Sequence, residues 1–336
     1  MIDDPATWLY PTPKGLYCAP GDFYIDPTRA VDRAVITHGH ADHARPGNRS
    51  VLATRQTLDI MRVRYGERAG NSMQALGYGE TVSINGVELG MAPSGHILGA
   101  AQVVVDWKGY RAVVSGDYKR ATDPTCASFE VVKCDLYITE ATFGLPVFVH
   151  ESAATEANRL VASLARSRHR THLLGVYGLG KCQRMISLVR SAGYAKPIYL
   201  HGALQGLCEY YASQGVELGE IRQFTDTQPE DLEGQLVLCP PNALADQWSR
   251  RMSDPLTVFA SGWMRVRARA RQCGAELPII VSDHADWPEL LQTISDVEAG
   301  EIWVTHGRED ALLHQISKMG LKGRALAVVG FEDEGE

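Results

Sequence analysis

The sequence of 336 residues lacks the features of a secreted or membrane-embedded chain. Its cysteines are odd in number, form no C-x-x-C pair and lie far apart, at positions 18, 126, 134, 182, 208, 239 and 273. This pattern excludes a fully paired disulfide framework and a cysteine-based zinc finger. No apolar run is long enough to span a bilayer, and the first residues, "MIDDPATWLY", do not resemble a signal peptide. We therefore expect a cytoplasmic protein without a membrane partner, whose cysteines are mostly small core residues.

An excess of positive charge is also absent. The chain has 33 lysines and arginines against 40 aspartates and glutamates, a formal net charge of −7. The chain as a whole is therefore not a basic nucleic-acid binder, although a local basic groove is still compatible with this composition. Two stretches are locally basic: "SLARSRHRTH" (163–172) and "GWMRVRARARQCG" (262–274), and the second contains four arginines and no acid.

The order of predicted elements indicates an α/β protein. Up to about residue 145 the pattern is mostly β, with hairpins at 81–90 and 101–117 that turn at Asn85-Gly86 and Lys108-Gly109, and a helix near 55–66. A helix is predicted over 151–167, and strands then alternate with helices through 171–252. Such alternation is typical of βαβ units with a parallel sheet. Strand, loop and helix follow one another again at 277–294 and 301–316.

The most specific pattern is "VITHGHADHA" (35–44), which follows a predicted strand. It places His38, His40, Asp42 and His43 within six residues, and imidazole with carboxylate suits a divalent ion such as zinc. One loop could supply two ions, whereas the structural alternative is a solvated polar loop. Three further donors lie in loops at strand ends, where functional residues gather: His96, Asp117 and His306.

These motifs together, "HGHADH", "SGH", "SGD" and a late "THG", resemble the metallo-β-lactamase fold. Within that fold the chain resembles the β-CASP nucleases, and specifically the bacterial ligase-associated DNA exonucleases. The long interval between Asp117 and His306, "ITEATFG" around Glu140 and "VSDHADW" around His284 carry the finer resemblance. It implies an αββα sandwich formed by residues 1–149 and 273–336, with a β-CASP α/β domain inserted at 150–272.

The resemblance also implies a role for individual residues. His38, His40 and His96 would hold one zinc ion, while Asp42, His43 and His306 would hold a second, and Asp117 would bridge the two. Asp26 in "FYIDP" would support the metal loop. Asp42, Glu140 and His284 would be catalytic, with His284 oriented by Glu140 as the proton donor. Manganese could replace zinc for activity.

Candidate nucleic-acid contacts lie in the middle of the chain. Lys181 and Gln183 in "GLGKCQRM" resemble a family motif, and a Gly-rich turn that opens a helix presents N–H groups to an anion. An ordinary strand–helix connection explains the same pattern. Arg265, Arg267, Arg269 and Arg271 recur at period two, so in a strand or extended loop they would line one face. Trp263 could stack on a base or belong to the core.

The resulting expectation is a two-metal phosphodiesterase, most consistent with a single-stranded DNA exonuclease in DNA repair that works from 5′ ends. A DNA ligase and a repair helicase are the partners implied by resemblance. Three alternatives remain open at this point. They are an RNA-processing β-CASP ribonuclease, a small-molecule hydrolase of the same fold, and an inactive DNA-binding scaffold.

Overall fold

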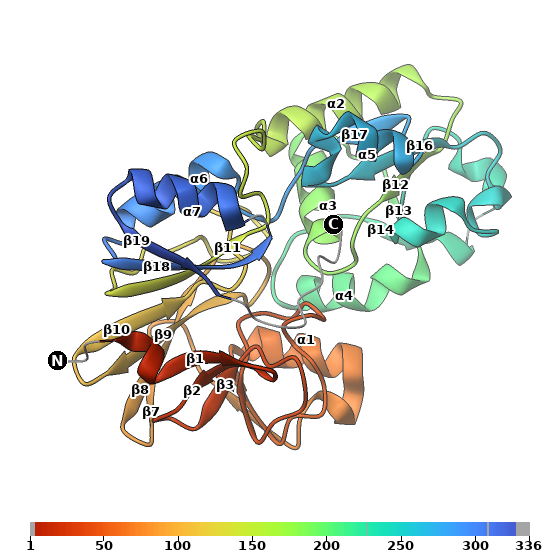
Figure 1. Ribbon diagram of the computed structural model, residues 1–336. Coiled ribbons are helices and arrows are strands. Elements are labelled where there is room, and N and C mark those ends of the chain that lie inside the picture. Colours follow the sequence, from red (N-terminus) through yellow and green to blue (C-terminus); the bar gives the residue numbers. More distant parts are fainter. Residues whose placement is uncertain (1–3, 227, 308, 327–336) are drawn as a thin grey trace. The chain divides into compact units, whose positions relative to one another are not determined.

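The computed structural model describes residues 4–226, 228–307 and 309–326 (Figure 1). The chain forms two compact units, one built from residues 1–149 with the segment from His284 onward and the other from residues 150–283. Within the described ranges, no helix is long and apolar enough to cross a membrane.

The first unit contains two β-sheets. One has the order β1 (Leu9–Thr12), β2 (Gly15–Cys18), β3 (Phe23–Ile25), β4 (Arg33–Val35), β5 (Ser50–Ala53) and β6 (Ser72–Ala75). The other has the order β19 (Lys322–Ala325), β18 (Glu301–Gly307), β11 (Leu136–Ala141), β10 (Tyr110–Val114), β9 (Ala101–Trp107), β8 (Val87–Pro93) and β7 (Thr81–Ile84). Strands β7 to β10 are antiparallel, whereas β10, β11, β18 and β19 run parallel.

Both predicted hairpins of this second sheet are confirmed. They connect β7 to β8 and β9 to β10. Asn85 and Gly86 have φ values of 52° and 81°, and Lys108 and Gly109 have values of 50° and 78°. Positive φ at both central residues is what a two-residue type I′ turn requires, and Asn-Gly is its preferred sequence.

The two sheets form the middle of a four-layer arrangement. A continuous apolar cluster joins them and includes Ile25 from the first sheet with Val103 and Ile138 from the second. Helix α1 (Arg55–Tyr65) packs on the first sheet through Leu58 and Met61. Helices α6 (Trp287–Asp296) and α7 (Glu309–Lys318) pack on the second sheet, where their side chains meet alternate residues of β11. Because successive strand residues point to opposite faces, β11 is buried on both sides.

The second unit has one parallel sheet, with the order β14 (Ile221–Gln223), β13 (Ile198–Leu200), β15 (Leu236–Cys239), β12 (His172–Gly175), β16 (Leu256–Ala260) and β17 (Leu277–Ile279). Its α-helices are α2 (Ala153–Arg166), α3 (Lys181–Ser191), α4 (Gly202–Ser213) and α5 (Arg267–Gln272). The predicted alternation of strands and helices is therefore confirmed. The unit extends to residue 283 rather than to the expected residue 272, because β17 pairs with β16 in the same sheet.

Candidate metal centre

The candidate site lies where strands of the first unit end. The loop with His38, His40, Asp42 and His43 follows β4, and Asp117 follows β10. Glu140 is the penultimate residue of β11, and His306 is the penultimate residue of β18. Because β10, β11 and β18 are parallel neighbours, their carboxyl ends meet at one edge of the sheet. Loops at such an edge are the usual location of functional residues.

A first group of donors is formed by His38, His40, His96 and Asp117. The Nδ1 atom of His40 lies 3.1 Å from His38 Nε2 and 3.0 Å from His96 Nε2, and Asp117 Oδ2 lies 3.3 Å from His38 Nε2. Nitrogen ligands about 2 Å from a tetrahedral zinc ion lie roughly 3.3 Å apart. One ring nitrogen carries a single lone pair or a single proton, so His40 Nδ1 cannot form good hydrogen bonds with both neighbours. A shared cation fits this donor spacing.

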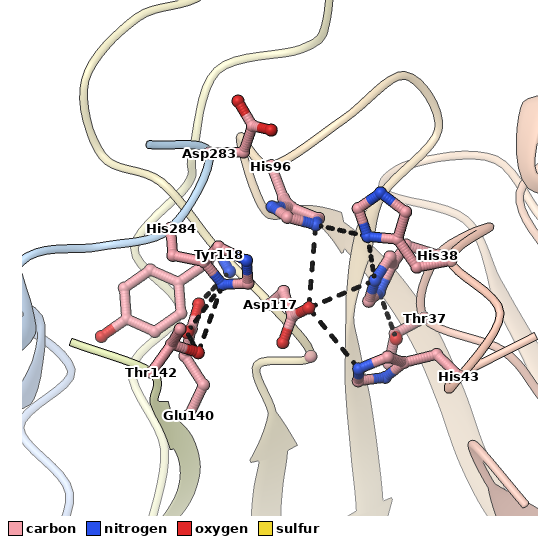
Figure 2. Close-up of polar contacts among 12 residues, drawn as sticks. Thr37, His38, His43, His96, Asp117, Tyr118, Glu140, Thr142, Asp283 and His284 are labelled. Atoms are coloured by element: carbon pink, nitrogen blue, oxygen red, sulfur yellow. Dashed lines mark hydrogen bonds and ion pairs between the residues drawn. The ribbon is translucent and has the colours of Figure 1, made fainter. Parts of the chain in front are cut away.

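A second group contains His43, Asp117 and His306, so Asp117 belongs to both groups. His43 Nε2 lies 3.5 Å from Asp117 Oδ2 and 3.4 Å from Asp42 Oδ2. The rings of His43 and His306 are 5.4 Å apart. Figure 2 shows His38, His43 and His96 arranged around the carboxylate of Asp117. Six of the seven predicted metal ligands therefore belong to these two groups, and the seventh, Asp42, contacts them through His43 with a side chain that is 20% exposed.

Asp26 and Thr37 orient the imidazole rings from behind. Asp26 Oδ2 accepts hydrogen bonds from His43 Nδ1 at 2.8 Å and from the Thr37 hydroxyl at 2.6 Å. Since that hydroxyl donates to Asp26, it accepts from His38 Nδ1 at 3.0 Å. In their neutral forms both histidines then direct the lone pair of Nε2 toward Asp117, as a metal ligand must. The sequence predicts a supporting role for Asp26 but not for Thr37, whose only signal is a hydroxyl directly before the first histidine.

The electrostatics of the cluster favour a bound cation. Burial lowers the pKa of His38 well below its usual value, and burial together with His43 lowers the pKa of His306 to about 3. Burial raises the pKa of Asp117 to about 7. Neutral imidazole is the ligand form of histidine, and a cation offsets the cost of a buried carboxylate. His43 differs: burial lowers its pKa, but Asp42, Asp117 and Asp26 together raise it to about 10.

His284 and Glu140 form a third possible donor group with Asp117, beside the other two groups. Glu140 is fully buried, and its Oε2 atom lies 2.9 Å from His284 Nδ1. The carboxylate also accepts from Tyr118 N at 2.7 Å and from the Thr142 hydroxyl at 2.6 Å (Figure 2). The His284 ring lies 4.7 Å from the His96 ring. With Nδ1 engaged by Glu140, Nε2 is the nitrogen of His284 that faces away from this carboxylate. Tyr118 and Thr142 were not predicted.

The structure contradicts the prediction that Lys181 and Gln183 contact nucleic acid, because both are fully buried in the second unit. Lys181 Nζ donates to Val281 O at 2.8 Å and lies 3.3 Å from Asp283. Gln183 caps its own helix: its Oε1 accepts from Gly180 N at 2.9 Å, and its Nε2 donates to Gly178 O at 3.0 Å. The Gly-rich turn is an internal connection between β12 and α3.

The arginine run does not form the expected strand or extended loop. Arg265 ends a short 3-10 helix (Gly262–Arg265), and Arg267, Arg269 and Arg271 belong to α5. A helix sends residues two apart to different faces, so the four side chains do not share one line. All four are nevertheless exposed. Trp263 is buried, as the core alternative predicted, and the guanidinium of Arg269 lies 4.1 Å above its ring.

Comparison with known proteins gives three informative relatives. The chain is 26% identical over 329 residues to a protein of Opitutus terrae named probable DNA ligase, which covers 95% of this chain and 31% of that protein. It is 29% identical to "Endoribonuclease YSH1" of Gibberella zeae, over 57% of this chain and 22% of that protein. It is 28% identical to "Cleavage and polyadenylation specificity factor subunit 3" of Dictyostelium discoideum, over 52% of this chain and 22% of that protein. Their printed names are those of a probable DNA ligase, an endoribonuclease and a cleavage and polyadenylation factor.

These likenesses are limited in length and in sequence identity. The chain spans about a third or less of the length of these curated relatives. No family model matches the chain. A solved structure from Enterococcus faecalis, titled as a protein of unknown function, covers 89% of this chain with a TM-score of 0.58 at 12% identity. That likeness supports a mixed α/β fold alone.

Proposed function

We propose that the chain is a metal-dependent nuclease of the β-CASP group, with the first unit as its metallo-β-lactamase αββα sandwich and the second as its inserted domain. The observation that carries the proposal is that two donor groups share one carboxylate, Asp117, with the Glu140–His284 pair directly beside them. Two metal ions that share a ligand are typical of hydrolases that cleave phosphodiesters.

In this proposal His38, His40 and His96 would hold one zinc ion, and Asp42, His43 and His306 would hold the other, with Asp117 as a donor common to both sets. The bound ions would lower the pKa of a water molecule and offset negative charge at the scissile phosphate. His284 then donates a proton from Nε2 to the leaving oxygen. Glu140 holds the ring at Nδ1 and stabilises its protonated form.

The proposed substrate is single-stranded DNA, degraded from its 5′ end during repair. The support is the Opitutus terrae relative, in which a segment similar to nearly all of this chain occurs in a much longer protein named a DNA ligase. A DNA ligase is accordingly a proposed partner, and the family resemblance adds a repair helicase as a second proposed partner. RNA is the second candidate substrate, since the other two relatives carry the names of an endoribonuclease and of a cleavage and polyadenylation factor.

The test compares single-stranded DNA, duplex DNA and RNA of one sequence, each labelled at the 5′ or the 3′ end. Chelator-treated protein receives zinc, manganese or magnesium in turn. We expect metal-dependent release of short 5′ products from single-stranded DNA. His40→Ala and Asp117→Ala should lower the rate by on the order of 10³-fold, because each removes a donor. His314→Ala, a variant of an exposed histidine in α7, is the matched control.

Two results would contradict parts of this proposal. Equal cleavage by wild type, His40→Ala and Asp117→Ala would exclude the metal mechanism. Cleavage of RNA together with intact DNA would replace the DNA substrate by the RNA alternative.

A further inference from the structure

One carboxylate, that of Glu289, connects the two segments that carry Asp117 and His284. Glu289 lies in the first turn of α6, which begins shortly after His284. Its Oε2 atom accepts a hydrogen bond from Lys119 Nζ at 2.7 Å, and its Oε1 atom accepts from Ala121 N at 2.9 Å. Lys119 and Ala121 belong to the segment that directly follows Asp117. Glu289 therefore holds two residues of this segment at once, beside a second link in which Arg120 Nη2 donates to Asp296 Oδ2 at 2.7 Å.

Helix capping explains only part of this arrangement. Asp286 and Glu289 form a capping box, in which Glu289 N donates to Asp286 Oδ1 at 3.2 Å and Asp286 N donates to Glu289 Oε2 at 3.3 Å. A capping box needs no further partner of the glutamate. The contacts with Lys119 and Ala121 are shorter than the capping bonds and come from a segment about 170 positions earlier in the chain.

The connection is shielded from solvent. The side chains of Lys119 and Glu289 are only 10% and 18% exposed, so their interaction is screened less than a surface ion pair. The same segment makes two further links: Tyr118 O accepts from Ala285 N at 2.6 Å, and Lys119 N donates to Ser94 O at 3.0 Å. Ser94 lies just before His96 in the chain. Lys119, in the segment that carries Asp117, thus contacts both the segment that carries His96 and the segment that carries His284.

We propose that Glu289, through Lys119, is a positioning residue that fixes His284 relative to Asp117. The inference rests on the proposed function, in which His284 transfers a proton at the site. Proton transfer requires an approach of hydrogen-bond length, so a small displacement of His284 lowers the rate of the chemical step. The contact between Lys119 and Glu289 is called the tie below. Neither residue is a metal donor in this proposal, so we expect substrate affinity and metal content not to depend on the tie.

The test uses Glu289→Gln and Lys119→Met, with Lys119→Arg as the conservative rescue. Lys133→Met is the matched control, because Lys133 pairs with Glu298 at 2.6 Å in the same unit but both side chains are more than 60% exposed. We expect Glu289→Gln and Lys119→Met to lower kcat about tenfold with KM within about twofold of wild type. Lys119→Arg should recover most of the rate, and Lys133→Met should match wild type.

Two further measurements do not depend on activity. Hydrogen exchange followed by mass spectrometry should show faster exchange in peptides that contain Tyr118 and Ala285 in the two tie variants only. Bound metal per protein should stay unchanged in all of them. If wild type cleaves no nucleic acid, the proposed function fails, while the exchange measurement still decides whether the tie holds the two segments. Unchanged exchange, or loss of metal from either tie variant, would overturn the positioning role.

Discussion

The two units of this molecule bury polar side chains next to strand ends in opposite ways. In the first unit, imidazoles and carboxylates converge on Asp117, and their nearest neighbours are other groups of the same kind. In the second unit, Lys181 and Arg184 face the carboxylate of Asp283, with Arg184 Nη1 at 2.8 Å from its Oδ1 atom. Lys181 Nζ also donates to Val281 O, and Arg184 Nη1 also donates to Ser282 O.

This difference indicates which of the two buried clusters, around Asp117 or around Asp283, is suited to bind a ligand. Lone pairs that point toward one another repel and do not satisfy each other, so a cluster of like donors needs a cation from outside. In the second unit the donors of Lys181 and Arg184 face a carboxylate and backbone carbonyls, so donors meet acceptors. Motifs at strand ends suggest a functional site in both units. Of these two clusters, only the one around Asp117 consists of metal-donor groups that face one another.

The largest expected effect that sharpens this comparison concerns His284. His284→Ala should lower single-turnover cleavage by about 10²- to 10⁴-fold, which is the usual contribution of a general acid. The metal content should stay at the wild-type value, because His38, His40, His43, His96 and His306 are retained. Metal analysis and rapid-quench kinetics on one preparation measure both quantities, with His314→Ala as control. Loss of metal from His284→Ala would assign this residue to the donor groups instead.

The next effect should appear in stability rather than activity. Lys181→Met removes one cation from the buried group of the second unit, while Arg184 still faces Asp283. We expect the free energy of unfolding in urea to fall by about 2 kcal/mol, since the broken pair is buried. Lys196→Met, at an exposed lysine of the same unit, should change it by less than about 0.5 kcal/mol. The folded variant should bind nucleic acid with the same affinity as wild type. A loss of affinity without a loss of stability would indicate instead that Lys181 belongs to the nucleic-acid-binding surface.

The sequence predicts the candidate metal donors because their signals are local and specific. Four of them lie within six residues, and the others lie at or just after the ends of strands whose β-branched patterns are clear. Thr37, Tyr118 and Glu289 were not predicted, because a single hydroxyl, a backbone N–H and a helix-capping glutamate have no distinctive pattern. Their partners come from other segments of the chain, so only the tertiary structure reveals them.

The two failed interpretations in the second unit have different physical reasons. The partner of Lys181 lies about 100 positions later in the chain, so the Gly-rich turn alone could not show that its ammonium is internal. For the arginine run, the period of two residues is typical of a strand, whereas the structure has a helix there. Arginine, alanine and glutamine are strong helix formers, and "RARARQ" contains no β-branched or aromatic residue, so intrinsic propensity favoured the observed helix α5 over a strand.

The smallest expected effect tests whether α5 still contributes to substrate binding in spite of its helical form. Arg267 and Arg271 are exposed and four residues apart, hence on one face of α5, whereas Arg269 stacks on Trp263. Replacing both by alanine should weaken binding of single-stranded DNA several-fold at low salt and reduce the slope of log K against log salt by roughly 1.4, which corresponds to two phosphate contacts. Fluorescence anisotropy with chelator-treated protein measures binding without cleavage. The matched control is Arg166→Ala with Arg168→Ala, which removes two exposed arginines from the other basic stretch of the same unit. Equal slopes for wild type and the α5 variant would exclude α5 from the binding surface, and an equal reduction in both variants would indicate a general effect of charge rather than contacts at α5.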